Sequence, residues 1–78
     1  MCGIIGINSN KPVSASIINS LKKLEYRGYD SAGIATLYAG SINEVKSEGR
    51  VDNLEKNSLV QNMVGTIGIG HVRWATHG

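Results

Sequence analysis

The order of predicted elements places this chain of 78 residues in the α+β class. Three observations predict that class. An apolar strand occupies residues 2–7, an amphipathic helix follows it, and three later segments have the composition of strands. Because the strands are not each followed by a helix, the pattern differs from the regular strand-helix alternation of a parallel sheet.

The first strand and the first helix have clear local signals. Residues 2–7 alternate glycine with isoleucine, which suits a strand buried on at least one face. Pro12 lies where the first turn of a helix tolerates proline. The apolar residues that follow have helical spacing, namely Val13, Ile17, Ile18, Leu21 and Leu24. The sequence therefore predicts a helix that begins near Pro12 and ends before Gly28.

The second half of the chain contains a predicted hairpin, a short helix and a final strand. Residues 33–38 and 42–47 have strand composition, and the Ala39-Gly40-Ser41 segment is a three-residue loop between them. Residues 50–57 form one short predicted helix. In the final strand, residues 66–73, the glycines at 68 and 70 indicate close approach of another segment or bulges. We expect this strand to need a sheet partner from sequence beyond residue 78.

Composition excludes several classes of function. The formal net charge of +2 is small and the basic residues are dispersed, which disfavours nucleic acid and anionic membranes as partners. No apolar stretch approaches the roughly 18 residues of a membrane span, and the N-terminus lacks signal-peptide features. We therefore expect a cytoplasmic protein. One cysteine cannot form an internal disulfide, and with two histidines it shows no zinc spacing, so we expect no metal.

Cys2 is the only cysteine, and it directly follows the initiator methionine. Removal of Met1 would give Cys2 both a thiol and a free α-amino group, and this amine can accept the thiol proton near neutral pH. Nucleophile and base would then belong to one residue, an arrangement that suits attack on an amide or ester carbonyl. The alternative is a cysteine that packs as a small apolar side chain.

The last eight residues, HVRWATHG, concentrate groups that recognise ligands. Arg73 has a planar guanidinium suited to a bidentate bond with a carboxylate, while Trp74 and Thr76 offer an apolar wall and a hydroxyl. The alternatives are a surface ion pair for Arg73 and core packing for Trp74. His71 and His77 are six residues apart, which matches no metal motif and favours satisfied structural histidines.

Three stretches carry a family resemblance: MCGIIGI at the start, LEYRGYDSAG at residues 24–33 and GHVRWATHG at residues 70–78. Together they resemble the class II glutamine amidotransferase domain that begins the isomerizing glutamine:fructose-6-phosphate aminotransferases. The resemblance covers the whole chain in the expected order. Another class II amidotransferase is the alternative among enzymes. Tyr26 and Trp74 disfavour the purine-pathway member, which typically has histidine and tyrosine at these positions.

The resemblance implies a fold and a reaction. The implied fold is the α+β sandwich of the N-terminal-nucleophile hydrolases, with two antiparallel sheets between helical layers, of which this chain is the N-terminal part. By the same resemblance, Cys2 attacks the side-chain amide of glutamine with its own α-amino group as base. Arg73 matches the arginine that binds the α-carboxylate of glutamine.

Further residues and partners follow from the resemblance alone. Trp74, Thr76 and His77 match positions that line the glutamine pocket, and Arg27 and Gly28 match a loop beside the nucleophile. The implied substrates are L-glutamine and, for the whole protein, fructose 6-phosphate, which accepts the ammonia. The resemblance implies no cofactor, and it implies a homo-oligomeric whole protein.

The resemblance also indicates what residues 1–78 lack. The family's oxyanion donors, an Asn-Gly pair, and its sugar isomerase domains lie beyond residue 78. We therefore expect residues 1–78 to be an N-terminal fragment of the amidotransferase domain that does not hydrolyse glutamine by itself. The alternative outside enzymes is a truncated chain that acts only in assembly.

Overall fold

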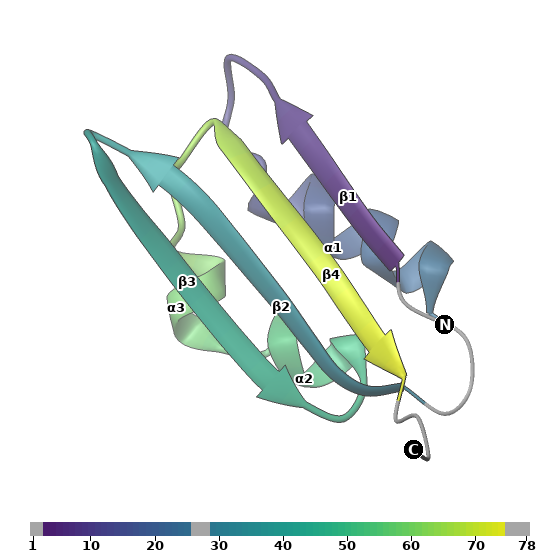
Figure 1. Ribbon diagram of the computed structural model, residues 1–78. Coiled ribbons are helices and arrows are strands. Elements are labelled where there is room, and N and C mark those ends of the chain that lie inside the picture. The colour runs from purple at the N-terminus through teal and green to yellow at the C-terminus, as the bar shows by residue number, and fades with distance from the viewer. Residues whose placement is uncertain (1–2, 26–28, 75–78) are drawn as a thin grey trace.

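The computed structural model describes residues 3–25 and 29–74, with the backbone alone at positions 29, 30 and 74. Within these residues, strands and helices form one sheet and one helical layer (Figure 1). The strands are β1 (Gly3–Asn8), β2 (Tyr29–Tyr38), β3 (Ser41–Glu48) and β4 (Ile67–Trp74). The helices are α1 (Ser14–Leu24), α2 (Val51–Glu55) and α3 (Ser58–Gln61). The predicted α+β class is confirmed.

The sheet has the order β1-β4-β2-β3, and every neighbouring pair is antiparallel. The last strand in the sequence, β4, therefore lies in the interior of the sheet. The expectation that this strand needs a partner from downstream sequence was wrong, because β1 and β2 occupy its two sides. Among the described strands, β1 and β3 lie at the edges of the sheet instead.

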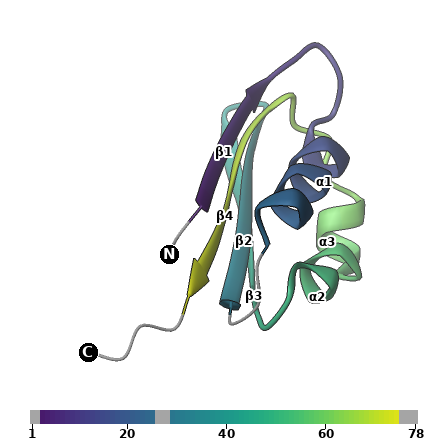
Figure 2. The same cartoon turned by 90° about the vertical axis from the view of Figure 1, so that its right-hand side faces the viewer.

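All the described helices pack on one face of the sheet, as Figure 2 shows from the side. The core between the layers includes Ile17 and Leu21 of α1, which are fully buried, together with Ile34 of β2. Two glycines of β4 let α1 approach closely. An added Cβ would lie 2.5 Å from Ile17 Cγ2 at Gly70, and 2.8 Å from Ile17 Cδ1 at Gly68. The predicted close approach at these glycines is confirmed.

Polar contacts join α1 to α2. Lys22 Nζ donates a hydrogen bond to Glu55 Oε1 at 2.6 Å and lies 3.8 Å from Asp52 Oδ1. The bond to Glu55 is the main reason that the pKa of Lys22 is raised above its ordinary value of 10.5. At the end of α1, Glu25 Oε2 accepts a hydrogen bond of 2.8 Å from the backbone N–H of Val51. This carboxylate satisfies a donor in the first turn of α2, where helix N–H groups lack partners within the helix.

Local predictions differ from the structure in three places. Tyr38 pairs with Ser41, so the hairpin turn has two residues rather than three. Ala39 and Gly40 both have positive φ, 51° and 81°, which is the conformation of the tight turns that match strand twist. β2 begins earlier than residue 33, and α3 follows α2 as a separate helix.

No helix in the described ranges is long and apolar enough to cross a membrane.

Candidate functional site

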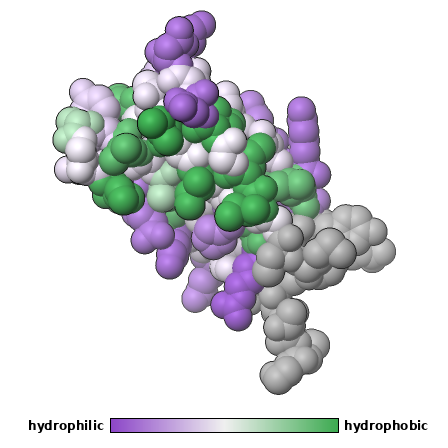
Figure 3. Space-filling view, turned by 45° about the horizontal axis from the view of Figure 1, so that its top comes forward, coloured by the Kyte–Doolittle hydropathy of each residue, from purple (hydrophilic) through white to green (hydrophobic). Residues whose placement is uncertain are grey.

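Arg73 is the one predicted site residue with a described side chain, and it lies on the sheet face opposite the helices. We call this surface the open face, because no described element covers it (Figure 2). Cross-strand pairing and alternation assign to it Ile4, Gly6, Asn8, Ser31, Gly33, Ala35, Leu37, Ile42, Glu44, Lys46, Glu48, Ile67, Ile69, His71 and Arg73. Figure 3 shows apolar side chains gathered on this side of the molecule.

The open face changes in character along the strands. Toward the hairpin turn it is apolar, with Leu37, Ile42 and Ile67 in one cross-strand row and all three exposed. Toward the opposite end it becomes polar, where Arg73 and Glu48 flank Ser31 in another row. Isolated apolar residues are common on protein surfaces, whereas a contiguous apolar patch indicates an interaction surface.

Arg73 is exposed at the polar end of the open face. It pairs with Ser31 across β2 and β4. Among the ion pairs of the described residues none involves Arg73, so the alternative of a structural surface ion pair has no support within that part of the chain. Its guanidinium is available to a ligand from the open side of the sheet.

The other predicted site residues have no described side chain. Cys2, Arg27, Gly28, Thr76 and His77 lie outside the described residues, and Trp74 is described by its backbone alone.

The backbone nevertheless brings together the ends of the stretches that contain the predicted site residues. β1 starts at Gly3, directly after Cys2, and Gly3 pairs with Val72. β2 starts at Tyr29, directly after Arg27-Gly28, and Tyr29 pairs with Trp74. Segments separated by dozens of residues in sequence thus meet at one end of the sheet, which local sequence patterns could not reveal.

His71 also lies on the open face, between Ile4 of β1 and Gly33 of β2. It is half-buried, and its imidazole makes no hydrogen bond with a described residue. The expectation of a satisfied structural histidine therefore has no support in the hydrogen bonds of the described chain. No group of metal-binding side chains is present among the described residues either.

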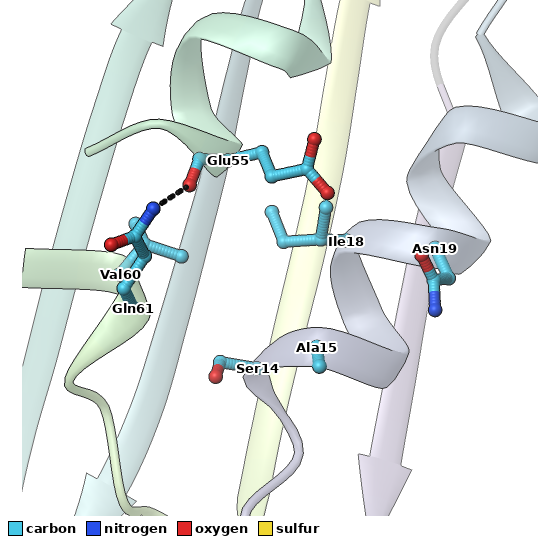
Figure 4. A pocket seen from close by; sticks show the side chains of 7 residues that line it. All are labelled: Ser14, Ala15, Ile18, Asn19, Glu55, Val60 and Gln61. Carbon is cyan, nitrogen blue, oxygen red and sulfur yellow. Dashed lines mark hydrogen bonds between the residues drawn. The ribbon is translucent and has the colours of Figure 1, made fainter. Parts of the chain in front are cut away.

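A hollow of about 340 Å³ lies on the helical side, between α1 and the two short helices (Figure 4). Ile18 and Val60 provide its apolar lining, and Gln61 donates a hydrogen bond to the Glu55 backbone oxygen beside it. The sheet separates this hollow from Arg73. Its lining residues include neither a cysteine nor a cationic side chain, so the chemistry predicted for Cys2 and Arg73 does not belong there.

Comparison with known proteins agrees with this arrangement. The chain is 55% identical, over all 78 residues, to the glutamine--fructose-6-phosphate aminotransferase (isomerizing) of Rhizobium meliloti strain 1021. The chain matches the N-terminal part of these aminotransferases. It spans 13% of the length of that relative. No family model matches the chain.

Two solved structures share the fold. One, described as the allosteric regulatory enzyme of purine biosynthesis, gives a TM-score of 0.84 at 26% identity and covers 97% of this chain and 16% of its own. The other, glutamine phosphoribosylpyrophosphate amidotransferase from B. subtilis complexed with ADP and GMP, gives 0.83 at 26% identity and covers 99% and 17%. The chain therefore has the N-terminal part of the N-terminal-nucleophile amidotransferase fold, as predicted. Its described residues supply one sheet and one helical layer of the sandwich.

Proposed function

We propose that this chain is the N-terminal part of a glutaminase domain in which Cys2 is the nucleophile and Arg73 binds the α-carboxylate of glutamine. The observation that carries the proposal is the register of β1 and β4. In each pair of this register the two residue numbers add to 75, from Asn8 with Ile67 to Gly3 with Val72. We propose that the same register continues by one position, which would place Cys2 opposite Arg73.

Alternation supports the same geometry. In β1 the exposed positions are Ile4, Gly6 and Asn8, and in β4 the exposed Ile69 and Arg73 are on the open face. Because side chains alternate between the faces of a strand, extension of β1 by the proposed one position would put residue 2 on the same face as Ile4. The proposal thus puts the nucleophile and the carboxylate-binding group on neighbouring strands and on one face, as recognition of a single small substrate requires.

The proposed reaction uses the two functional groups of the mature Cys2. The thiol proton passes to the α-amino group while sulfur bonds to the side-chain carbonyl carbon of glutamine. The proton then reaches the amide nitrogen as the carbon–nitrogen bond breaks, so ammonia leaves and a γ-glutamyl thioester remains. Water adds to the thioester, the carbon–sulfur bond breaks, and glutamate and the free thiol are released.

The rest of the site and the acceptor belong to the whole protein in this proposal. Arg27 and Gly28 lie in the loop beside Cys2, and Trp74, Thr76 and His77 line the glutamine pocket. Sequence outside residues 1–78 supplies the oxyanion donors and the domains that transfer ammonia to fructose 6-phosphate. The whole protein is a cytoplasmic homo-oligomer that needs no cofactor for this step, and residues 1–78 alone do not turn over glutamine.

The nucleophile is tested in the full-length protein. Intact mass should show a mature chain that starts at Cys2. Cys2→Ala should lower glutamine-dependent synthesis by about a thousandfold or more while fructose 6-phosphate isomerisation continues, because the two reactions belong to separate domains. Activity of the variant within about tenfold of wild type, only about 1.4 kcal/mol of barrier, would contradict the assignment of Cys2.

Arg73→Lys tests binding separately from chemistry. Lysine keeps the charge but loses the planar fork, so kcat/KM for glutamine should fall about tenfold to a hundredfold while alkylation of the Cys2 thiol is unchanged. Arg50→Lys is the matched control, because Arg50 is an exposed arginine that pairs with Glu25 on the helical side. Equal kcat/KM values for the two variants would remove Arg73 from the proposed pocket.

A second candidate function is assembly without catalysis, and the apolar part of the open face favours it. Ile4, Ile42 and Ile69 are each more than half exposed there, at 73%, 74% and 51%. The 78-residue chain should then self-associate through this face in sedimentation experiments, and Ile69→Lys should weaken the association. A glutaminase defect in the full-length Cys2→Ala protein would favour the catalytic candidate over this one.

A further inference from the structure

Gly33 and His71 make an unusual contact on the open face. The strand register assigns Gly33 to the open face, which no described element covers. Gly33 is nevertheless buried. The imidazole of His71 lies over it. A Cβ added to Gly33 would overlap His71 Nε2 and would come within 3.1 Å of Cδ2 and 3.2 Å of Cε1. The edge of the ring therefore occupies the space in which a side chain at position 33 would begin.

Packing of the helical layer does not explain this glycine. Gly68 and Gly70 face α1, where a Cβ would meet side-chain carbons of Ile17. Gly33 faces the other way and meets a polar ring. Gly6, also on the open face, is different again, because a Cβ there would meet only Ile69 Cγ2 at 3.8 Å and the Gly68 oxygen at 3.9 Å, which are ordinary contacts.

The contact lies directly beside Arg73. His71 and Arg73 are two positions apart in β4, so their side chains leave the same face about 7 Å apart. The row that contains His71 and Gly33 is next to the row that contains Arg73 and Ser31. The ring lies over Gly33 of β2, in the row that adjoins the Arg73 row on the side toward the centre of the sheet.

We propose that His71 is a positioning residue of the glutamine site, and that Gly33 is required because it leaves room for the imidazole. The ring keeps the Arg73 side chain from folding back over the sheet, so that the guanidinium stays at the strand end where β1 begins. This inference rests on the proposed function of Arg73.

The test is a double-mutant cycle in the full-length protein. Gly33→Ala should displace the ring and raise KM for glutamine about three- to tenfold with little change in kcat, since only the pose of the binding group is altered. His71→Ala should give a similar rise. The double variant should show no further rise, because the ring that the new methyl group displaces is already absent. Gly6→Ala is the matched control and should leave KM unchanged.

Several outcomes would overturn the inference. One is a folded Gly33→Ala protein with KM within about twofold of wild type, and another is a double variant in which the two effects multiply. If Gly33→Ala does not fold, an unchanged KM in His71→Ala still refutes the role of the ring. If KM for glutamine rises in Arg73→Lys but is unchanged in Gly33→Ala and His71→Ala, the positioning role of His71 is refuted and the role of Arg73 stands. An unchanged KM in Arg73→Lys refutes the proposed role of Arg73, on which this inference rests.

Discussion

The two faces of the sheet use the same strands for different purposes. Strand β4 shows this most clearly, because Gly68, Gly70 and Val72 point into the helical layer, while the larger Ile69 and Arg73 are exposed on the open face. On the covered face, small residues allow a close-packed core with α1. On the open face, large side chains are displayed at the surface. Large apolar side chains that gather at a surface are typical of an interaction site. The covered face therefore serves stability, and the open face serves function.

Truncation of an isoleucine on each face should give the largest contrast. Ile17→Ala removes a side chain that is fully buried between α1 and the sheet, and it should cost about 2 to 5 kcal/mol of unfolding free energy. Ile69→Ala removes a side chain that is 51% exposed, and the cost should be under about 1 kcal/mol. Urea denaturation monitored by circular dichroism measures both values. Similar losses would mean that the open face is as well packed as the covered one.

Addition of a methyl group sharpens the same contrast at a smaller scale. Gly70→Ala would place a Cβ 2.5 Å from Ile17 Cγ2, so the helix must shift and stability should fall by about 1 to 3 kcal/mol. Gly6→Ala on the open face meets nothing closer than 3.8 Å and should change stability by about 0.5 kcal/mol at most. Equal effects at Gly70 and Gly6 would contradict the close approach of α1.

Much of this division could be predicted from local sequence, and some of it could not. The helical spacing of Ile17 and Leu21 predicted α1, and the glycines of β4 predicted close approach. The order of strands could not be predicted, because no local pattern encodes which strand lies between β1 and β2. α3 was missed because its four residues are too few to show a helical period, although Asn57 is a usable start signal and its side chain accepts a bond from Leu59 N.

For the candidate site, sequence identified the residue types, while the fold supplies their neighbours. The predicted importance of Arg73 came from its guanidinium and its motif, both of which are visible in the sequence. That Ser31 lies beside Arg73 depends on strand pairing, and so does the contact of Gly33 with the His71 ring. Contacts of this kind join residues about 40 positions apart, a separation over which periodicity carries no information.

Thr36 offers a smaller test of the covered face. It is 2% exposed, and its Oγ1 has no hydrogen-bond partner among the described residues. Thr36→Val keeps the branched shape and removes an unsatisfied hydroxyl, so the unfolding free energy should stay constant or rise by about 1 kcal/mol. Thermal denaturation of the variant beside wild type measures the change. A clear loss of stability would indicate that the hydroxyl has a partner after all.

The ion pair of Lys22 should give the smallest effect, because exposed pairs contribute little to stability. A raised pKa in the folded chain means that its contribution is complete below 10.5 and is lost as pH rises beyond that value. Lys22→Met should therefore lower Tm at neutral pH, and the difference from wild type should shrink in strongly alkaline buffer. Lys23→Met is the control, since Lys23 is exposed and has no ion pair with a described residue.

The interior position of β4 has a consequence for synthesis on the ribosome. The hairpin of β2 and β3 can form once the whole of β3 has emerged. In contrast, the partner of β1 among the described residues is β4, so β1 must wait until residue 72 leaves the exit tunnel. For most of translation of this segment, the nascent N-terminus is therefore an unpaired strand. The removal of Met1 that we propose can therefore take place before β1 pairs with β4.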